Sequence, residues 1–186
     1  MSFARSVKLA LPAWIDEIVA RFDPKLESDE ARMELAIALS RENVERAGGP
    51  FGAAVFAGDV LVAAGVNCVL SSGFSIAHAE IIALTSAQQV AAMAPLALYA
   101  STEPCCQCFG AIVWSGVTRL VCGATTADAE AVGFDEGPKP DSWQAALELR
   151  GISVRCGVRS AEAKAVLEEY ARRGGVIYGG QRPGAR

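Results

Sequence analysis

The chain has 186 residues, of which 52% are hydrophobic and 20% are charged, so it can bury one substantial core and is short for two domains. A formal charge of −4 and scattered arginines exclude a broad basic surface for nucleic acid and favour a small neutral ligand. Because the amino-terminal apolar run ends at Asp16 and Glu17, before it reaches the length of a signal peptide or a membrane span, we expect a cytosolic protein with reduced cysteines and no membrane partner.

The first half of the chain predicts one long helix followed by a β-hairpin. Ser28 can cap a helix over residues 28–46, which two glycines then terminate. Two Ala/Val-rich runs at 51–56 and 60–64 are separated by a Gly-Asp turn and predict the hairpin. The serine-rich stretch 68–77 that follows is expected to be a loop.

The second half alternates helices with strands. The predicted segments, in chain order, are a helix at 78–93, a strand at 96–100, a helix at 104–114, a strand at 120–122, a Gly/Pro-punctuated connection at 128–142, a helix at 143–150, a strand at 152–156 and a helix at 160–173. This order favours an α/β fold, a three-layer α-β-α sandwich with a five-stranded mixed sheet. We expect a single domain over 1–186, with an amphipathic lead-in at 1–27 and a tail or flap at 174–186.

Two short motifs together predict a metal centre. His78 begins the motif His-Ala-Glu, and 27 residues later Pro-Cys-Cys-Gln-Cys supplies Cys105 and Cys108. One imidazole and two thiolates are a ligand set that suits one zinc ion per chain and leaves its fourth position for water, as catalytic zinc requires. Zinc lowers the pKa of bound water to about 7, so a nucleophile is available at neutral pH.

Helix geometry supports this interpretation. Cys105 and Cys108 are three residues apart at a predicted helix start, so they share one face, and the positive helix end is expected to lower both thiol pKa values. Cys106 is offset around the helix and should point elsewhere. His78 and Glu80 are two residues apart, so both can reach one metal only if it lies off the start of their helix.

Each motif taken alone is also compatible with a role outside catalysis. A Cys-x-x-Cys pair can be a redox pair or part of the core, and a lone histidine is usually structural. A closed structural zinc site would need Cys68, Cys106 or Cys122 as its fourth ligand, and it would leave Glu80 without a role. The combination of His-x-Glu with Pro-Cys-x-x-Cys is instead the signature of zinc deaminases.

At these residues the chain resembles the cytidine deaminase superfamily and, within it, the bacterial guanine deaminases. The resemblance lies in the segments Gly48–Gly52, Asn67, His78–Glu80, Thr102–Cys105, Cys108–Ile112, Trp114–Val117 and Gly133–Pro138. It implies a zinc-dependent hydrolytic deaminase that converts a free purine base, with guanine the leading substrate, to an oxo-heterocycle, here xanthine, plus ammonia. It also implies a homodimer.

Three polar residues are predicted to act on the substrate. Glu80 is expected to move protons between water, a ring nitrogen and the departing amine. The resemblance implies that Glu136 is a second carboxylate for the leaving amine, although Asp-Glu-Gly-Pro is also an ordinary acidic turn. The resemblance assigns substrate binding to Asn67, whose amide can donate and accept; an Asx turn at the strand end is the competing account.

Aromatic and backbone groups complete the predicted pocket. Phe51 and Phe134 lie beside glycines in predicted loops and can stack on a flat ring, whereas Trp114 is a weaker candidate and such aromatics are often core residues. Ala79 can offer its free backbone N–H at the helix start. The resemblance suggests that Tyr178 closes the pocket as part of a flap.

Three alternative functions stay open at this point. The same chemistry can act on another small heterocycle, such as cytosine, a nucleoside, a pterin or an aminotriazine like ammeline. A tRNA adenosine deaminase shares the metal motif but needs a basic surface, which the net charge disfavours. A non-enzymatic zinc protein would have a closed metal site and no deaminase activity.

Overall fold

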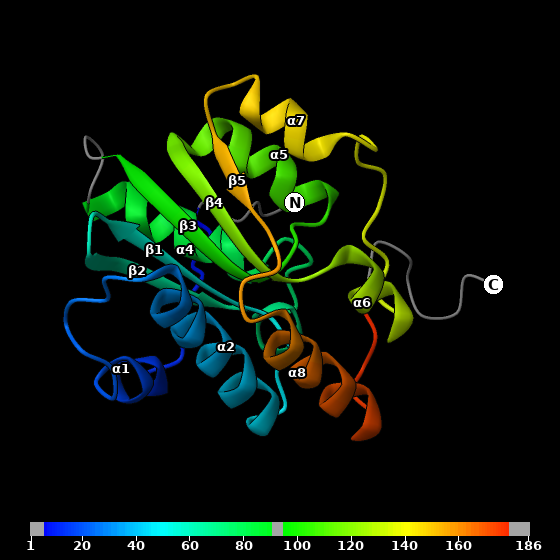
Figure 1. Ribbon diagram of the computed structural model, residues 1–186. Coiled ribbons are helices and arrows are strands. Elements are labelled where there is room, and N and C mark those ends of the chain that lie inside the picture. The colour runs from blue at the N-terminus through cyan, green and yellow to red at the C-terminus, as the bar shows by residue number, and fades with distance from the viewer. Residues whose placement is uncertain (1–5, 91–94, 179–186) are drawn as a thin grey trace.

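A computed structural model describes residues 6–90 and 95–178, and it contains a five-stranded mixed sheet (Figure 1). The strands are β1 (Gly52–Ala57), β2 (Val60–Val66), β3 (Leu96–Thr102), β4 (Val117–Ala124) and β5 (Ser153–Arg155). Their order is β2-β1-β3-β4-β5, in which β1 pairs antiparallel with β2 and β3 while β3, β4 and β5 are parallel. The predicted sheet is therefore confirmed.

Helices cover both faces of this sheet, as the sandwich prediction requires. The helices are α1 (Trp14–Val19), α2 (Asp29–Glu45), α3 (Val69–Ser72), α4 (Ala79–Val90), α5 (Cys106–Ser115), α6 (Thr126–Ala131), α7 (Trp143–Glu148) and α8 (Ser160–Arg172). Figure 1 shows α2 and α8 on one face and α4 and α5 on the other, and each face has its own apolar core. No helix within 6–90 or 95–178 is both long and apolar enough to cross a membrane.

Two expected loops contain short helices. The connection predicted at 128–142 begins inside α6, where Thr125 and Asp128 form a reciprocal capping box. The loop predicted at 68–77 contains α3, a single turn that ends at Gly73 in the left-handed conformation. The lead-in contains α1, and the last residues of the helix predicted at 78–93 lie outside the described part of the chain.

Glycines in the hairpin bring both helical layers close to the sheet. A Cβ on Gly52 would overlap with the Ala36 carbonyl of α2, and a Cβ on Gly65 would overlap with the Ala79 carbonyl of α4. Only glycine leaves room for such close helix–sheet packing. The contact at Gly65 fixes the first turn of α4 against β2, and this turn directly follows His78.

The parallel strands end beside each other, and the chain then enters α5 and α6. Thr102 ends β3 four residues before Cys106 begins α5, and Ala124 ends β4 two residues before Thr126 begins α6. Ligand sites in open α/β sheets form beyond the carboxyl ends of strands. The fold therefore brings the predicted metal ligands and the loop after α6 to one edge of the sheet.

Candidate active site

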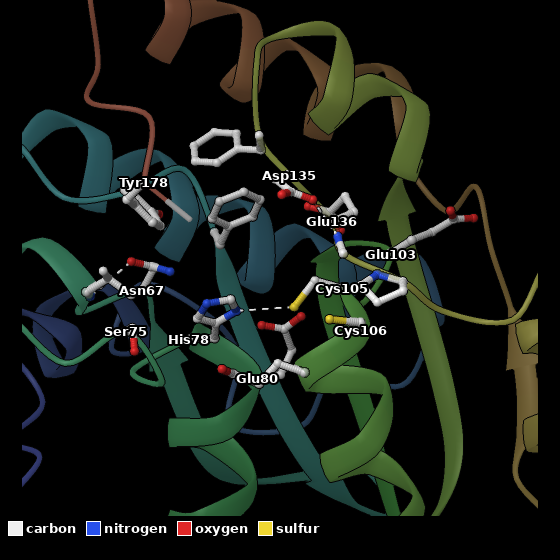
Figure 2. A pocket seen from close by; sticks show the side chains of 16 residues that line it. Asn67, Ser75, His78, Glu80, Glu103, Cys105, Cys106, Asp135, Glu136 and Tyr178 are labelled. Carbon is white, nitrogen blue, oxygen red and sulfur yellow. Dashed lines mark hydrogen bonds between the residues drawn. The ribbon is translucent and has the colours of Figure 1, made fainter. Parts of the chain in front are cut away.

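Three side chains from two helix starts converge at this edge. His78 immediately precedes α4, Cys105 occupies the amino-terminal cap position of α5, and Cys108 lies one turn further on. The Nδ1 atom of His78 is 3.4 Å from the Cys105 sulfur (Figure 2) and 3.5 Å from the Cys108 sulfur. All three candidate ligand atoms lie within 4.8 Å of one another, which is compact enough to hold one metal ion.

The donor set fits zinc. One imidazole nitrogen and two sulfurs are ligands that zinc prefers, and three protein ligands are typical of catalytic zinc sites. Within the described residues, no further histidine, cysteine, aspartate or glutamate joins this group as a fourth ligand. Cys68, Cys106 and Cys122 lie outside it. The arrangement thus favours an open metal site over the closed one that a structural zinc would need.

The two thiols differ in acidity. A hydrogen bond with Cys108, together with the neighbouring His78 and against the effect of burial, lowers the pKa of Cys105 to about 4. The same hydrogen bond raises the pKa of Cys108 well above its ordinary value, and burial adds to the rise. The pKa lowering that was expected at both thiols is therefore found only at Cys105. Cys108 keeps its proton and shares it with Cys105 as a hydrogen bond.

Two carboxyl groups with raised pKa values face the same pocket. Glu80, in the first turn of α4, is 8% exposed; burial raises its pKa, and the negative charge of Cys105 adds to the rise. Glu136 lies in the loop after α6 and is 6% exposed. Burial and the charges of Cys105 and Glu80 raise its pKa to about 8. Carboxyl groups with raised pKa values are suited to proton transfer.

The pocket has a volume of about 340 Å³ and is lined by both polar and aromatic groups. Its lining includes His78, Glu80, Cys105, Glu136, Asn67, Phe51, Phe134 and Tyr178. Figure 2 shows His78 and Glu80 at the start of α4, Cys105 at the start of α5 and Glu136 in the loop after α6 around this pocket. Of the residues that the sequence marks for this site, only Ala79 and Trp114 belong to neither this lining nor the metal group, which Cys108 completes.

Asn67 makes the expected Asx turn and also lines the pocket. Its Oδ1 accepts a hydrogen bond from the backbone N–H of Val69 at 3.1 Å, which is the expected Asx turn. The residue is 2% exposed and lines the pocket, and this use of Oδ1 leaves its Nδ2 group as the donor available to a ligand. The side chain of Asn43 in α2 donates to the Asn67 carbonyl at 2.9 Å and to the Gly49 carbonyl at 2.8 Å, which fixes this strand end.

Aromatic rings form one wall of the pocket. Phe134 contacts Phe51 and Tyr178 edge-on, with ring centroids 4.9 and 5.3 Å apart, and Tyr170 of α8 stacks on it at 5.9 Å. Burial raises the pKa of Tyr178, and its buried hydroxyl has no hydrogen-bond partner among the described residues. A buried hydroxyl without a partner is unfavourable in the free protein. A ligand in the pocket could supply that partner.

The comparisons with known proteins agree with this geometry. Residues 26–124 match the family model described as the cytidine and deoxycytidylate deaminase zinc-binding region. The chain belongs to this deaminase family. It is a zinc-dependent aminohydrolase by this membership and by its ligand set. The recognition drawn from the sequence motifs is thereby confirmed.

Several relatives of the deaminase are guanine deaminases. A solved structure of guanine deaminase from Nitrosomonas europaea is 40% identical with a TM-score of 0.84, over 92% of this chain and 100% of that chain. A related structure in complex with 2,6-diaminopurine is 44% identical with a TM-score of 0.83, over 92% and 96%. The guanine deaminase of Bacillus subtilis is 37% identical over 111 residues, which are 58% of this chain and 71% of that protein.

Some predicted features of the deaminase need correction. Cys106 lies outside the metal group, as predicted, but it lines the pocket, where its sulfur packs against Gly137 of the loop that carries Glu136. Trp114 is 83% exposed on α5 and belongs neither to the core nor to the pocket. Ala79 is fully buried and is not among the lining residues, so a role for its backbone N–H stays a prediction.

Sequence reasoning also missed parts of the deaminase site. Glu103, Ser75 and Gln107 line the pocket without having been singled out, and Asn43 supports Asn67 from another element. The only sequence signal for Glu103 was its position immediately before the Pro-Cys pair of the metal motif. Of the predicted tail, the described residues end at Tyr178, and 179–186 lie outside them.

Proposed function

We propose that this chain is a guanine deaminase that converts guanine and water to xanthine and ammonia. The observation that carries the proposal is a His-Cys-Cys metal group in one pocket with two buried carboxyl groups, in a chain similar over nearly its whole length to the guanine deaminase of Nitrosomonas europaea. The substrate is a flat, neutral base, which suits a chain of net charge −4 with an aromatic pocket wall.

His78, Cys105 and Cys108 would hold one zinc ion per chain. When bound, zinc supplies a Lewis acid that makes water a nucleophile at neutral pH. The chain's own contribution begins with Glu80, whose buried carboxyl takes a proton from the attacking water and delivers it to a ring nitrogen. Water thereby adds to the amino-bearing carbon, which is C2 in guanine.

Glu136 serves the departing amine. Its pKa of about 8 means that the carboxyl is largely protonated at neutral pH, so it can donate a proton as the carbon–nitrogen bond breaks. Glu80 and Glu136 thus divide the acid and base work, and the pocket that they share excludes bulk water from both. The proton of the added hydroxyl replaces the one that Glu136 gives up, so xanthine keeps the oxygen from water and the nitrogen leaves as ammonia.

The remaining pocket residues bind and orient the base. Asn67 donates from Nδ2 to an acceptor on the purine edge, while Phe51 and Phe134 contact the ring. Ala79 is the further candidate donor, through its backbone N–H. Tyr178 covers the pocket, and its hydroxyl gains a hydrogen-bond partner when the base is bound. The oligomeric state and the location complete the proposal: a homodimer in the cytosol, acting in purine breakdown.

A substrate panel tests the choice of guanine. Purified zinc-loaded protein is incubated with guanine, cytosine, guanosine, a pterin, ammeline and a tRNA that carries an adenosine target, and ammonia or the deaminated base is measured. We expect turnover of guanine to exceed that of every other compound by at least about tenfold in kcat/KM. Preferential conversion of tRNA adenosine, with salt-dependent binding, would establish the competing RNA-editing function instead.

A further inference from the structure

The loop that carries Glu136 is held by a polar chain outside the pocket. No helix or strand includes Glu136, so its position depends on side-chain and backbone contacts. Three residues after it, the Nζ of Lys139 donates to the Pro104 carbonyl at 2.8 Å and to the Thr126 hydroxyl at 2.6 Å. The lysine also lies 5.0 Å above the Trp143 ring. Lys139 therefore ties the loop to the residue immediately before a predicted metal ligand.

Thr126 extends this chain to an anionic partner. Its hydroxyl accepts from Lys139 and donates to Glu103 Oε2 at 2.8 Å, and its backbone N–H donates to the same oxygen at 2.9 Å. Glu103 is in turn fixed between two strand ends, because its backbone N–H donates to the Ala124 carbonyl at 2.9 Å. The Thr126 hydroxyl thus links the Lys139 ammonium, from which it accepts a hydrogen bond, to the Glu103 carboxylate, to which it donates one.

A second contact shows what this chain positions. The backbone N–H of Cys106, free at the start of α5, donates to the carbonyl oxygen of Glu136 at 2.8 Å. The loop is therefore attached both at Glu136 and beyond it to the segment 103–106, which also contains Cys105. In Figure 2, Glu103 points away from His78 and Glu80, so its carboxylate is directed out of the catalytic cluster.

We propose that Lys139, Thr126 and Glu103 form a positioning clamp that holds Glu136 at its working distance from the metal ligands. The inference rests on the proposed function, in which Glu136 handles the leaving amine. Lys139 is not among the pocket-lining residues, and both of its partners lie outside the metal group, so it acts on Glu136 through the loop and through its charge and does not contact the base. Loss of the clamp should lower kcat and leave KM for guanine nearly unchanged.

Paired variants test the clamp. Lys139→Met removes the cation, Thr126→Val removes the hydroxyl at nearly constant shape, and Thr126→Ser keeps the hydroxyl. We expect the first two to lower kcat about 10- to 100-fold with zinc content unchanged, and Thr126→Ser to stay near wild type. Lys164→Met is the control, because Lys164 also contacts α6, but through Asp128 at 2.9 Å and not through Thr126.

A double variant shows whether the clamp acts through Glu136. In a Glu136→Gln background, Lys139→Met should lower kcat by less than about twofold, because the group that it positions is already inactive. An equal loss of kcat in both backgrounds would overturn the proposal. So would wild-type kcat in Lys139→Met and Thr126→Val.

Hydrogen exchange separates this inference from the proposed function. In zinc-loaded protein the Cys106 amide should exchange at least about tenfold faster in Lys139→Met than in wild type or Lys164→Met, because its acceptor on Glu136 moves away. This measurement needs no substrate. If wild type fails to convert guanine, the proposed function fails while the exchange result still decides the clamp; an unchanged Cys106 amide contradicts the clamp whatever the substrate.

Discussion

The sulfur of Cys106 occupies the space that a Cβ on Gly137 would need. Gly137 also has a φ of +66°, which glycine adopts without strain, and it directly follows Glu136. A thiol outside the metal group and a glycine in a turn thus set how closely the Glu136 loop approaches α5. This contact explains why Cys106 lines the pocket.

Gly137→Ala should therefore impair catalysis more than stability. The new methyl group strains the backbone by about 1 kcal/mol and also pushes the loop off Cys106, so we expect kcat to fall about tenfold or more. Gly151→Ala is the matched control, since Gly151 has a φ of +80° but open space around its Cβ position. Both variants should lose similar stability in urea, and equal kcat in the two would contradict the positioning role of this contact.

The metal ligands can be tested against a matched buried thiol. Cys108 and Cys122 are both fully buried, but only Cys108 belongs to the metal group. Cys108→Ala should weaken zinc binding by at least about 100-fold, whereas Cys122→Ala should keep one zinc per chain. Metal content after dialysis against a weak chelator provides the measurement. Zinc retained in Cys108→Ala, or lost equally in both variants, would show that the ligands have been misassigned.

Tyr178→Phe separates the ring of this residue from its hydroxyl. Because the hydroxyl is buried and has no partner among the described residues, its removal should leave stability unchanged or raise it by up to about 1 kcal/mol. If the hydroxyl binds the base, KM for guanine should rise about tenfold while kcat changes little. Tyr170→Phe is the comparison, because the Tyr170 hydroxyl donates to the Val176 carbonyl at 2.6 Å and should cost stability when removed. An unchanged KM in Tyr178→Phe would remove the hydroxyl from the binding site.

Asp29 is predicted to make stability depend on acid pH. It accepts hydrogen bonds from Tyr99 at 2.6 Å, Arg119 at 2.6 Å and Arg155 at 2.5 Å. Burial alone would raise the pKa of Asp29, but these bonds and the arginine charges outweigh it and hold the pKa below its ordinary value. The stabilisation is therefore complete above the unfolded-state pKa of about 3.9 and is lost as the pH falls through the lower folded-state pKa.

Asp29→Asn should accordingly lower the free energy of unfolding by about 2 kcal/mol at pH 7. The difference from wild type should shrink progressively below about pH 4, where the wild-type carboxylate also loses its charge. Urea denaturation at several pH values measures both effects, and Asp141→Asn, at an exposed carboxylate, is the control. A difference that is independent of pH would refute the ionic role of Asp29.

The metal ligands were predictable from sequence because their chemistry and their helix-start positions reinforce each other over short spacings. His78 and Glu80 lie within three residues, and Cys105 and Cys108 within four. The mixed sheet was equally accessible, since a hairpin followed by alternating elements admits few topologies. The capping-box residues Thr125 and Asp128 can be read from the sequence. The glycines and prolines that follow favoured a loop, however, so α6 was not predicted.

Contacts between distant segments were not predictable. Lys139 and Thr126 are 13 residues apart, and Thr126 and Glu103 are 23 apart, and neither spacing follows a helical or strand period. The same holds for Asn43, whose amide reaches Asn67 across 24 residues. Such contacts arise only once the sheet has brought its strand ends together, so they become visible in the structure and not in a pattern.

The most direct test of the proposed function compares zinc-loaded wild type with Glu80→Gln, with guanine as substrate and with zinc content determined in the same samples. Wild type should form xanthine and ammonia in equal amounts, and Glu80→Gln should hold the same amount of zinc while its kcat falls at least about 100-fold. Full activity in Glu80→Gln, or no xanthine from a wild-type protein that carries one zinc per chain, would contradict it.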